Sequence, residues 1–498
     1  MAAIITEKFR QHNADQFFES FSEASASTYY IFVGKATAFT SGTTGGSDSS
    51  PPTPTDSPSD TEFYAWDSMI AAKNVGTSDI TYSIPRRNWS NGTTYDMYDD
   101  NISSSNTTTS GASNLYDSTF YFMTSDYRVY KVLDNNAGSA YSGAEPTSES
   151  TSPFALGGYV LKYMYAITTS EAAKFLTSDF IPVSNDSTVS AAAVDGKIES
   201  LKVTAGSGYT NGTYYAAVYG DGTSAGTSSG AIVRITVSGG TIQSFGLTAG
   251  TDTTIHAGGA GYTFGTVNLA SGYTFSDAAL TSASAIGGSG GSIEVVISPK
   301  NGHGNDAIGE LGGHYVMTAT TLTQAENDDI TTVNDFRQVG LVIDPTNYGT
   351  STVASASTRR QTFVVKGSSS SGTFEVDEKI TQASTGAVGR VVEWDSTLSL
   401  LYFQQERFGD YGTNSTTGDH SVFTGANLIT GGTSSATLTP STDSETITLA
   451  NNNTLSTTSG YANPELQPDS GNIVYLENRK PIQRDSDQTE DIKLIIEF

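Results

Sequence analysis

Short runs of apolar and aromatic residues, separated by stretches rich in Gly, Ser, Thr and Asn, limit what this chain can fold into. The clearest runs are TFYFMTSDYRVYKVL, at residues 119–133, and residues 159–167. Both are rich in Tyr, Phe and Val, which favour strands because branched and aromatic side chains fit a pleated surface. We therefore predict a mainly β fold with a β-sandwich core and short helices in loops.

Helical patterns are scarce, and the clearest of them lie near the N-terminus. Asn13 with Gln16, and Ser59 with Glu62, have the spacing of a capping box at a helix start. Each pair precedes an aromatic stripe that we expect to pack into the core: Phe17, Phe18 and Phe21 in the first, and Phe63, Trp66 and Ile70 in the second. The segment at residues 29–33 between them predicts a strand.

Residues 195–297 differ in character from the rest of the chain. A Gly-Tyr-Thr turn recurs at Tyr209, Tyr262 and Tyr273, beside short alternating strands, and resembles a degenerate internal repeat. Glycine permits the positive-φ turns that such hairpins need. We predict an inserted Gly/Tyr-rich β module here.

A second insert-like region contains the strand-like segments QTFVVKG, GTFEVDEKITQ, AVGRVVEWD and LSLLYFQQERFGD. The chain then ends in two further strand-like segments, GNIVYLENRKPI and IKLIIEF, and an end this apolar is expected to pair into a sheet. The predicted organisation is the N-terminal part of the sandwich core at 1–194, the first inserted module at 195–297, a core continuation at 298–358, a second inserted β module at 359–460 and C-terminal core strands at 461–498.

Charge and composition exclude several classes of function. The formal net charge of −27 repels phosphate backbones, which disfavours nucleic acid as a partner. The absence of cysteine excludes disulfides, zinc–thiolate sites and thiol nucleophiles. No signal-peptide pattern is visible, and no apolar run approaches the ~20 residues of a membrane span, so we expect synthesis in a cytoplasm and no membrane partner.

Motifs for catalysis or cofactor binding are missing or incomplete. His303 and His314 lie in NGHGNDAIGELGGH with Asp306 and Glu310 between them, but the spacing matches no zinc pattern and favours a Gly-rich turn. Asn211 stands where the third glycine of a dinucleotide fingerprint belongs. There is no phosphate-binding loop and no nucleophile elbow. We predict no catalytic residues, no cofactor and no metal.

Three stretches are more specific than composition. They are IPRRNW at residues 84–89, DFRQVGLVIDP at 335–345, and GNIVYLENRKPIQRDSDQTEDIKLIIEF at 471–498. Together they resemble the baseplate wedge subunit encoded by gene eight of T4-like contractile-tailed phages, whose tail carries the same Tyr-x-Glu-Asn-Arg-x-Pro-Ile and Asp-Gln-Thr-Glu elements. The resemblance does not extend to residues 195–297 or 360–460.

That resemblance implies a structural protein and not an enzyme. Members of the family are mostly β-sandwich dimers that lie in the wedges of the sixfold baseplate and contact other wedge proteins. They take part in assembly and in the rearrangement that infection triggers. The implied partners are a second copy of the chain and other wedge proteins, and the implied location is the virion tail baseplate, assembled in the host cytoplasm.

The matching stretches supply the structural and interface candidates. Arg86 and Arg87 form a rare paired positive charge, and guanidinium groups suit carboxylate or carbonyl contacts either within the fold or across an interface. Pro85 fixes a turn, and Trp89 offers a large apolar anchor. The full set is Pro85, Arg86, Arg87, Trp89, Phe336, Arg337, Gln338, Tyr475, Glu477, Asn478, Arg479 and Pro481.

Two other functions compete with the wedge role. A tail-fibre or adhesin protein could bind host-surface glycans through Gly/Tyr-rich inserts, and glycan binding would distinguish it. A β-helical polysaccharide depolymerase would need a regular coil repeat through the whole chain, which the sequence lacks.

Overall fold

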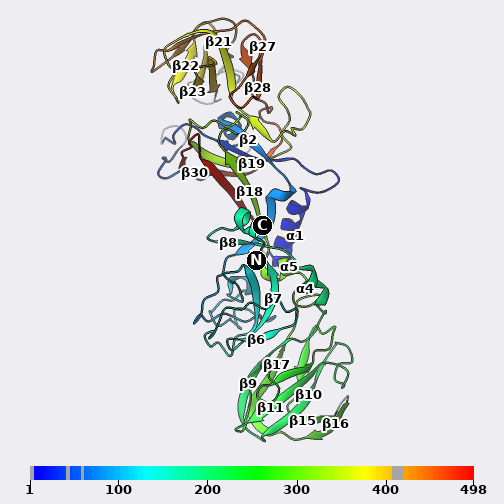
Figure 1. Cartoon of the computed structure of the whole chain (residues 1–498). Coiled ribbons are helices and arrows are strands. Elements are labelled where there is room, and N and C mark those ends of the chain that lie inside the picture. Colours follow the sequence, from blue (N-terminus) through cyan, green and yellow to red (C-terminus); the bar gives the residue numbers. More distant parts are fainter. Residues whose placement is uncertain (1–4, 41–44, 58–60, 271, 277–278, 406–419) are drawn as a thin grey trace. The chain divides into compact units, whose positions relative to one another are not determined.

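The computed structural model describes residues 5–40, 45–57, 61–270, 272–276, 279–405 and 420–498. In these residues antiparallel strands dominate and the helices are few and short, so the predicted mainly β class is confirmed (Figure 1). No helix in the described ranges is long and apolar enough to cross a membrane. The chain divides into two compact units, Met1–Gln16 with Thr81–Met317 and Ile495–Phe498 as unit 1, and Phe17–Ile80 with Thr318–Leu494 as unit 2.

Unit 1 contains a four-stranded antiparallel sheet of order β4-β5-β7-β6. Its strands are β4 (Tyr121–Met123), β5 (Arg128–Asp134), β6 (Phe154–Leu156) and β7 (Tyr159–Ala166). Phe122, Tyr130 and Leu161 pack into one core on one face, whereas Tyr121 and Val129 pack into another core. Burial on both faces explains why these strands read as continuous apolar runs.

Unit 1 also contains short helices and the paired strands β3 (Ile80–Pro85) and β8 (Phe180–Val183), which belong to another four-stranded sheet. β3 pairs with β8 from Tyr82 onwards. The helices are α3 (Thr169–Phe175), α4 (Ser187–Ala192) and α5 (Ala307–Leu311), and the 3-10 turn here is η2 (Leu115–Asp117). Thr168 and Glu171 form a capping box that begins α3, and the Asp186 carboxylate accepts two backbone N–H groups at the start of α4.

Residues 195–297 form a nine-stranded sheet in unit 1, with the main path β12-β11-β10-β14-β17-β9. Tyr209 and Tyr262 of the recurring turns are buried, and their hydroxyls accept hydrogen bonds from the backbone N–H groups of Gly291 and Ala231. Leu133 and Val160 of β5 and β7 belong to the same core. The strands are β9 (Ser200–Tyr209), β10 (Gly212–Gly220), β11 (Ile232–Ser238), β12 (Thr241–Ile242), β13 (Thr254–Ala257), β14 (Gly265–Val267), β15 (Gly272–Ser276), β16 (Ala279–Ser284) and β17 (Gly287–Val296).

Unit 2 is built around a five-stranded antiparallel sheet of order β20-β2-β1-β19-β30. The C-terminal strand β30 is paired along β19, as the apolar end of the sequence predicts, and Trp66 packs into the core beside Tyr30 and Phe32. The strands are β1 (Tyr29–Gly34), β2 (Met69–Val75), β19 (Phe336–Ile343), β20 (Thr358–Arg360) and β30 (Asn472–Ile482). The 3-10 turn η1 (Thr77–Asp79) follows β2, and β18 (Tyr315–Thr323) and β31 (Thr489–Glu497) each have residues in both units.

The two predicted helices exist, but the expected start of the first is wrong. α1 (Glu7–Glu19) begins before Asn13, which therefore lies inside the helix instead of capping it. α2 (Thr61–Ser68) ends before Ile70, which belongs to β2. Its expected cap, Ser59, lies outside the described residues. The error at Asn13 arises because a capping-box spacing can also occur by chance within a helix, where Asn has only modest helix propensity.

The second predicted insert contains a closed barrel within unit 2. The path β24-β23-β22-β25-β26-β21 closes because β21 also pairs with β24, and β29 adds to β21. Val365, Ile380, Val391 and Leu438 lie in its core. The strands are β21 (Phe363–Ser371), β22 (Lys379–Gln382), β23 (Ala387–Asp395), β24 (Leu400–Gln404), β25 (Ile429–Gly431), β26 (Thr437–Pro440) and β29 (Tyr461–Ala462), with a separate hairpin of β27 (Glu445–Thr448) and β28 (Thr454–Thr457).

Gly340 lies at a point where β19 packs closely against its neighbours. A Cβ atom there would lie 2.3 Å from the ring of Phe32 and 2.7 Å from the carbonyl oxygen of Tyr475. We expect Gly340→Ala to lower the free energy of unfolding by about 1–3 kcal/mol, since the extra atom overpacks the sheet. Chemical denaturation measures this change.

Gly76 provides the matched control for that substitution. A Cβ at Gly76 meets only the Asp79 carboxylate, at 3.9 Å, and the residue has a φ of −115° that alanine can adopt. Gly76→Ala should therefore change stability by no more than about 0.5 kcal/mol. Equal effects of the two substitutions would contradict the tight packing at Gly340.

Candidate structural sites and interface residues

The paired arginines of the IPRRNW segment bind carbonyl oxygens of their own chain. Arg86 donates through Nη1 to the carbonyl of Thr177 at 2.7 Å. Arg87 donates through Nη2 to the carbonyl of Tyr116 at 2.8 Å, and its guanidinium carbon lies 4.4 Å from the centroid of the Tyr121 ring. These contacts give both guanidinium groups an intrachain role in fixing the loop after β3.

Pro85 and Trp89 anchor the two ends of the same segment. The carbonyl of Pro85 accepts a hydrogen bond from the hydroxyl of Tyr121 at 2.6 Å. Trp89 packs edge-on against Tyr141, with ring centroids 5.8 Å apart, and its backbone N–H donates to the carbonyl of Met123. Among the described residues no acceptor binds the buried indole Nε1 of Trp89. The segment is thus attached to the four-stranded sheet of unit 1.

Arg337 fastens a loop to β19 in unit 2. Its guanidinium forms a fork with the Asp48 carboxylate, with Nε and Nη2 each 3.0 Å from one oxygen, and Nη1 donates to the carbonyl of Ala36 at 2.5 Å. These hydrogen bonds hold the pKa of Asp48 below its usual value. Phe336 beside it is only 1% exposed and lies in the interior. Both residues stabilise the fold from within.

Gln338 and Asn478 connect β19, β30 and a second part of that loop. The Gln338 side-chain amide donates to the Asn478 side-chain oxygen at 2.9 Å, and Asn478 donates to the carbonyl of Pro52 at 2.9 Å. Tyr475 donates to Glu477 at 2.9 Å, and burial together with that hydrogen bond raises the pKa of Tyr475 to about 12. The C-terminal segment therefore contacts this loop and also pairs with β19 in the sheet.

The remaining tail candidates face solvent. The side chains of Glu477 and Arg479 are 40% and 48% exposed, and their charged atoms are 3.8 Å apart. Pro481 lies where the register of β30 shifts, between Asn478 opposite Gln338 and Ile482 opposite Phe336. The structure thus divides the candidates into residues bound within the chain and a small accessible set on β30.

A buried charged cluster in unit 1 was not identified from the sequence. Lys131 of β5 and Lys162 of β7 are directly opposite each other in the sheet, and both are buried. The Lys131 ammonium donates to Glu310 at 2.8 Å, lies 3.0 Å from Nδ1 of His303 and sits 3.8 Å from the centroid of the Tyr98 ring. A lone lysine within each apolar strand was the available signal, because lysine is rarely buried without a partner.

The surroundings fix the charge state of His303. Burial lowers its pKa well below the usual value, and the charges of Lys131 and Lys162 lower it further. Its Nδ1 therefore accepts from Lys131, and the ring proton lies on Nε2. Burial also lowers the pKa of Lys131, while the carboxylate of Glu310 opposes that effect. The arrangement is a buried ion pair with a neutral histidine.

The structure does not bring the two histidines of the Gly-rich segment together into one site. His303 joins the lysine cluster, whereas Nδ1 of His314 lies 3.3 Å from the Glu7 carboxylate. Asp306 caps α5 by accepting the N–H of Gly309. Within the described ranges, no group of three or more His, Asp or Glu side chains is placed to hold a metal ion.

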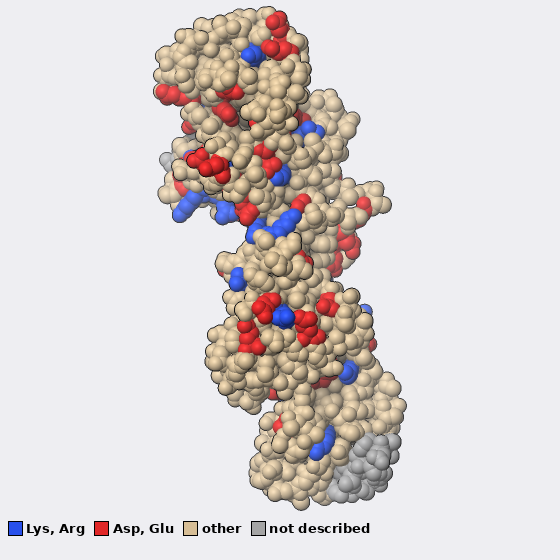
Figure 2. Space-filling model, in the orientation of Figure 1, with Lys and Arg blue, Asp and Glu red and all other residues tan. Residues whose placement is uncertain are grey.

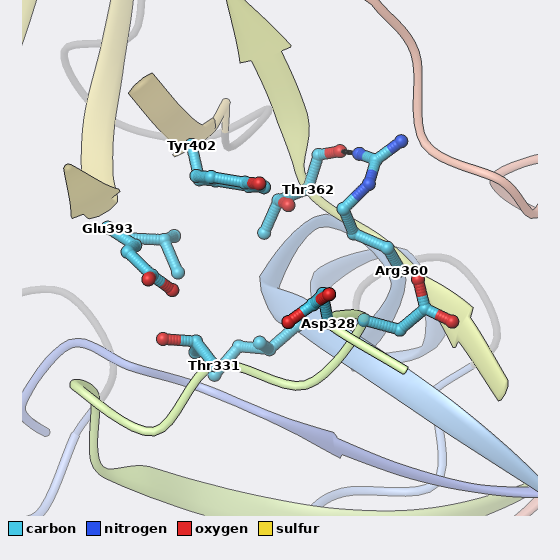
Figure 3. A pocket seen from close by; sticks show the side chains of 9 residues that line it. Asp328, Thr331, Arg360, Thr362, Glu393 and Tyr402 are labelled. Carbon is cyan, nitrogen blue, oxygen red and sulfur yellow. Dashed lines mark hydrogen bonds between the residues drawn. The ribbon is translucent and has the colours of Figure 1, made fainter. Parts of the chain in front are cut away.

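A small polar cavity of about 10 Å³ lies in unit 2, close to the lower limit for one water molecule. Figure 3 shows the side chains of Thr331, Glu393 and Tyr402 around this space. The full lining is Ile70, Asp328, Asp329, Thr331, Arg360, Thr362, Val392, Glu393 and Tyr402. It includes residues of the barrel and of the five-stranded sheet.

Burial dominates the electrostatics of this cavity. It raises the pKa of Asp329 to about 6, with a further increase from the charge of Glu465, and it raises the pKa of Glu393. Asp329 accepts a hydrogen bond from the hydroxyl of Thr358 at 2.6 Å. Arg360 donates to the carbonyls of Thr362 and Asn463. Three half-buried acidic residues, Asp328, Asp329 and Glu393, thus line this space together with one guanidinium.

Comparison with family models shows which known proteins parts of this chain resemble. A family model described as Phage-Gp8, from bacteriophage T4 Gp8, matches residues 3–144 and 442–498. Over these two segments, which together make up less than half of the chain, the sequence is similar to the phage Gp8 family. This is a structural family of the phage baseplate, so the protein is located in the virion tail baseplate. No curated protein matches the chain.

The matched residues cover only part of the candidate set. They include the IPRRNW segment and every tail candidate from Tyr475 to Pro481, but not residues 336–338. The Gp8 match omits residues 145–441, which include the first predicted insert and the predicted core continuation at 298–358. It resumes at 442, inside the second predicted insert. The boundaries of the two inserts stay predictions.

The Lys131–Glu310 pair predicts a strong and non-additive response to substitution. Lys131→Met leaves the Glu310 carboxylate buried without its counter-charge, and should lower the free energy of unfolding by about 3–5 kcal/mol. Glu310→Gln should also destabilise, since it leaves the ammonium uncompensated. The double variant Lys131→Met with Glu310→Gln should cost much less than the two single changes combined. Urea denaturation of all three provides the test, and additive effects would contradict the coupling.

Asp329 predicts a pH dependence of stability. Because its pKa is about 6 in the folded chain and 3.8 ordinarily, the native state binds more protons than the unfolded state between these values. Stability from this group is therefore present at low pH and lost as pH rises through about 6. Asp329→Asn should flatten the profile between pH 4 and 7 and raise stability at pH 7 by up to about 3 kcal/mol.

Thermal unfolding across that pH range measures the effect of Asp329→Asn. Asp487→Asn is the matched control because Asp487 is exposed on the segment before β31. An unchanged pH profile in the Asp329 variant would show that this carboxylate does not titrate as its burial requires.

Proposed function

We propose that this protein is a baseplate wedge subunit that forms a homodimer and contacts neighbouring wedge proteins. It joins them during assembly and takes part in the rearrangement that infection triggers. It acts through binding surfaces and not through catalysis. The observation that supports this proposal most directly is the position of β30, a strand inside the family match, at the edge of its sheet.

An edge strand offers backbone groups to another chain. In the part of the chain that the structure describes, β30 pairs with β19 alone, and a strand with one neighbour presents unpaired N–H and C=O groups on its other side. The register shift after Asn478 and the missing N–H of Pro481 limit where a partner strand can pair. The accessible part of this edge therefore runs from Asn472 to Asn478.

Charge adds specificity at the end of this edge. Arg479 and Lys480 are exposed on β30 in a chain whose net charge is −27. On the face drawn in Figure 2, Lys and Arg side chains form small groups on a mostly uncharged surface. A second acidic copy, or another acidic subunit, would supply the carboxylates, and such complementarity mainly orients partners and speeds their encounter.

Hydrogen bonds within the chain already order this region, which reduces the entropic cost of binding a partner. Arg337 and Asn478 hold the loop that contains Asp48 and Pro52 against β19 and β30. Side chains and loops that are already ordered lose little conformational freedom on association. Many modest contacts of this kind, repeated around a sixfold assembly, give a stable baseplate through multivalency.

Charge reversal on β30 tests the interface. The unmodified chain should sediment as a dimer, and Arg479→Glu with Lys480→Glu should raise the dissociation constant at least about tenfold, since like charges then oppose an acidic partner. Lys300→Glu is the control because it reverses an exposed lysine of unit 1. Analytical ultracentrifugation across a concentration series gives the dissociation constants.

Two results would contradict the proposal separately. A chain that stays monomeric at all concentrations would overturn the homodimer. Imaging of intact phage particles that shows the protein only in tail fibres, with no density in the baseplate wedges, would overturn the wedge role.

A further inference from the structure

The outer face of the sheet at residues 195–297 carries two exposed aromatic rings. Tyr219 of β10 is 44% exposed and Phe264, just before β14, is 57% exposed. Tyr219 lies opposite Thr266 in the strand pair, and Phe264 is two residues before Thr266. Residues related in this way lie diagonally on one face of a sheet, within reach of each other's rings.

A row of polar side chains continues across the same face. Thr266 of β14 lies opposite Glu294 of β17, and Glu294 lies opposite Lys202 of β9. Their strand neighbours Val218 and Val295 point the other way, into the buried core. Since adjacent strands are about 4.8 Å apart, the row from Tyr219 to Lys202 spans about 14 Å.

Local contacts hold the aromatic end of this row in place. The carboxylate of Asp221 accepts the backbone N–H groups of Thr263 and Phe264, at 2.9 and 3.3 Å, and so fixes the turn that carries Phe264. Gly226 lies directly against the ring of Tyr219, where a Cβ atom would approach to 2.7 Å. The rings are therefore presented by an ordered surface.

We propose that this face binds a neutral, hexose-containing polysaccharide of the bacterial surface. The apolar C–H face of a pyranose ring stacks on Tyr219 and Phe264, and sugar hydroxyls bind the Thr266 hydroxyl and the Glu294 carboxylate. The strand spacing of about 4.8 Å is close to the width of one sugar ring, so adjacent strands can contact adjacent parts of a disaccharide. This role goes beyond the structural function proposed above.

The composition of the face favours a sugar over other ligands. A protein partner would need a larger apolar centre, but the residues beyond the two rings are polar, including the exposed Thr204 and Ser292. The carboxylate of Glu294 and the net charge of −27 disfavour nucleic acid and acidic polysaccharides.

Binding of the full-length chain to an array of bacterial surface polysaccharides and their oligosaccharide repeats tests the proposal. The unmodified chain should bind a subset of neutral members. Tyr219→Ala and Phe264→Ala should each weaken that binding at least about tenfold, whereas Tyr219→Phe should retain it because the ring remains. Leu247→Ala is the matched control, since Leu247 is 40% exposed in the same β region but outside this row.

Each outcome decides for or against the site. Loss of binding in the two alanine variants, with unchanged thermal unfolding and an unaffected control, supports it. No binding to any array member, or binding that the alanine variants leave unchanged, overturns it. Failure of Tyr219→Ala to enter baseplates, without polysaccharide binding by the unmodified chain, would instead make this face a protein interface and also overturn the proposal.

Discussion

The antiparallel pairing of β19 with β30 supports much of the organisation of unit 2. It joins residues such as Gln338 and Asn478, which are 140 positions apart, and attaches the C-terminal segment to the sheet that contains β1 and β2. Because residue 340 is a glycine, both the ring of Phe32 and the carbonyl oxygen of Tyr475 can pack closely against β19. Since the entropic cost of loop closure rises slowly with length, the intervening barrel can be accommodated between the two strands.

Open and closed edges divide the β structure into parts with different roles. The barrel of β21–β26 closes on itself, which removes the free edges along its ring that would otherwise promote aggregation. β30 keeps one side without a strand partner among the described residues, and its register shift, Lys480 and Pro481 restrict pairing at one end. The proposed interface at β30 would therefore be limited to a short accessible edge.

Unit 1 contains a buried ion pair. The Lys131–Glu310 pair carries a desolvation cost, and its geometry is satisfied only when the segment around His303 lies against β5 and β7. We interpret the pair as a source of structural specificity more than of stability. The cavity around Asp329 and Glu393 contrasts with it, because three acidic residues line it beside one guanidinium and burial raises the pKa of Asp329.

The sequence by itself determined the mainly β class, the family resemblance, strands with clear apolar runs such as β5 and β7, and the pairing of the C-terminal segment, because these follow from local patterns and a specific C-terminal motif. Only the tertiary structure decided that Lys131 and Glu310 meet, that β21 and β24 close a barrel, and that Arg337 binds Asp48 while Arg479 faces solvent. Local patterns can also mislead: Asn13 and Gln16 have the spacing of a capping box, but both lie inside α1. The physical reason is that pairing and burial depend on residues distant in the chain, and one sequence without aligned relatives carries no direct record of those contacts.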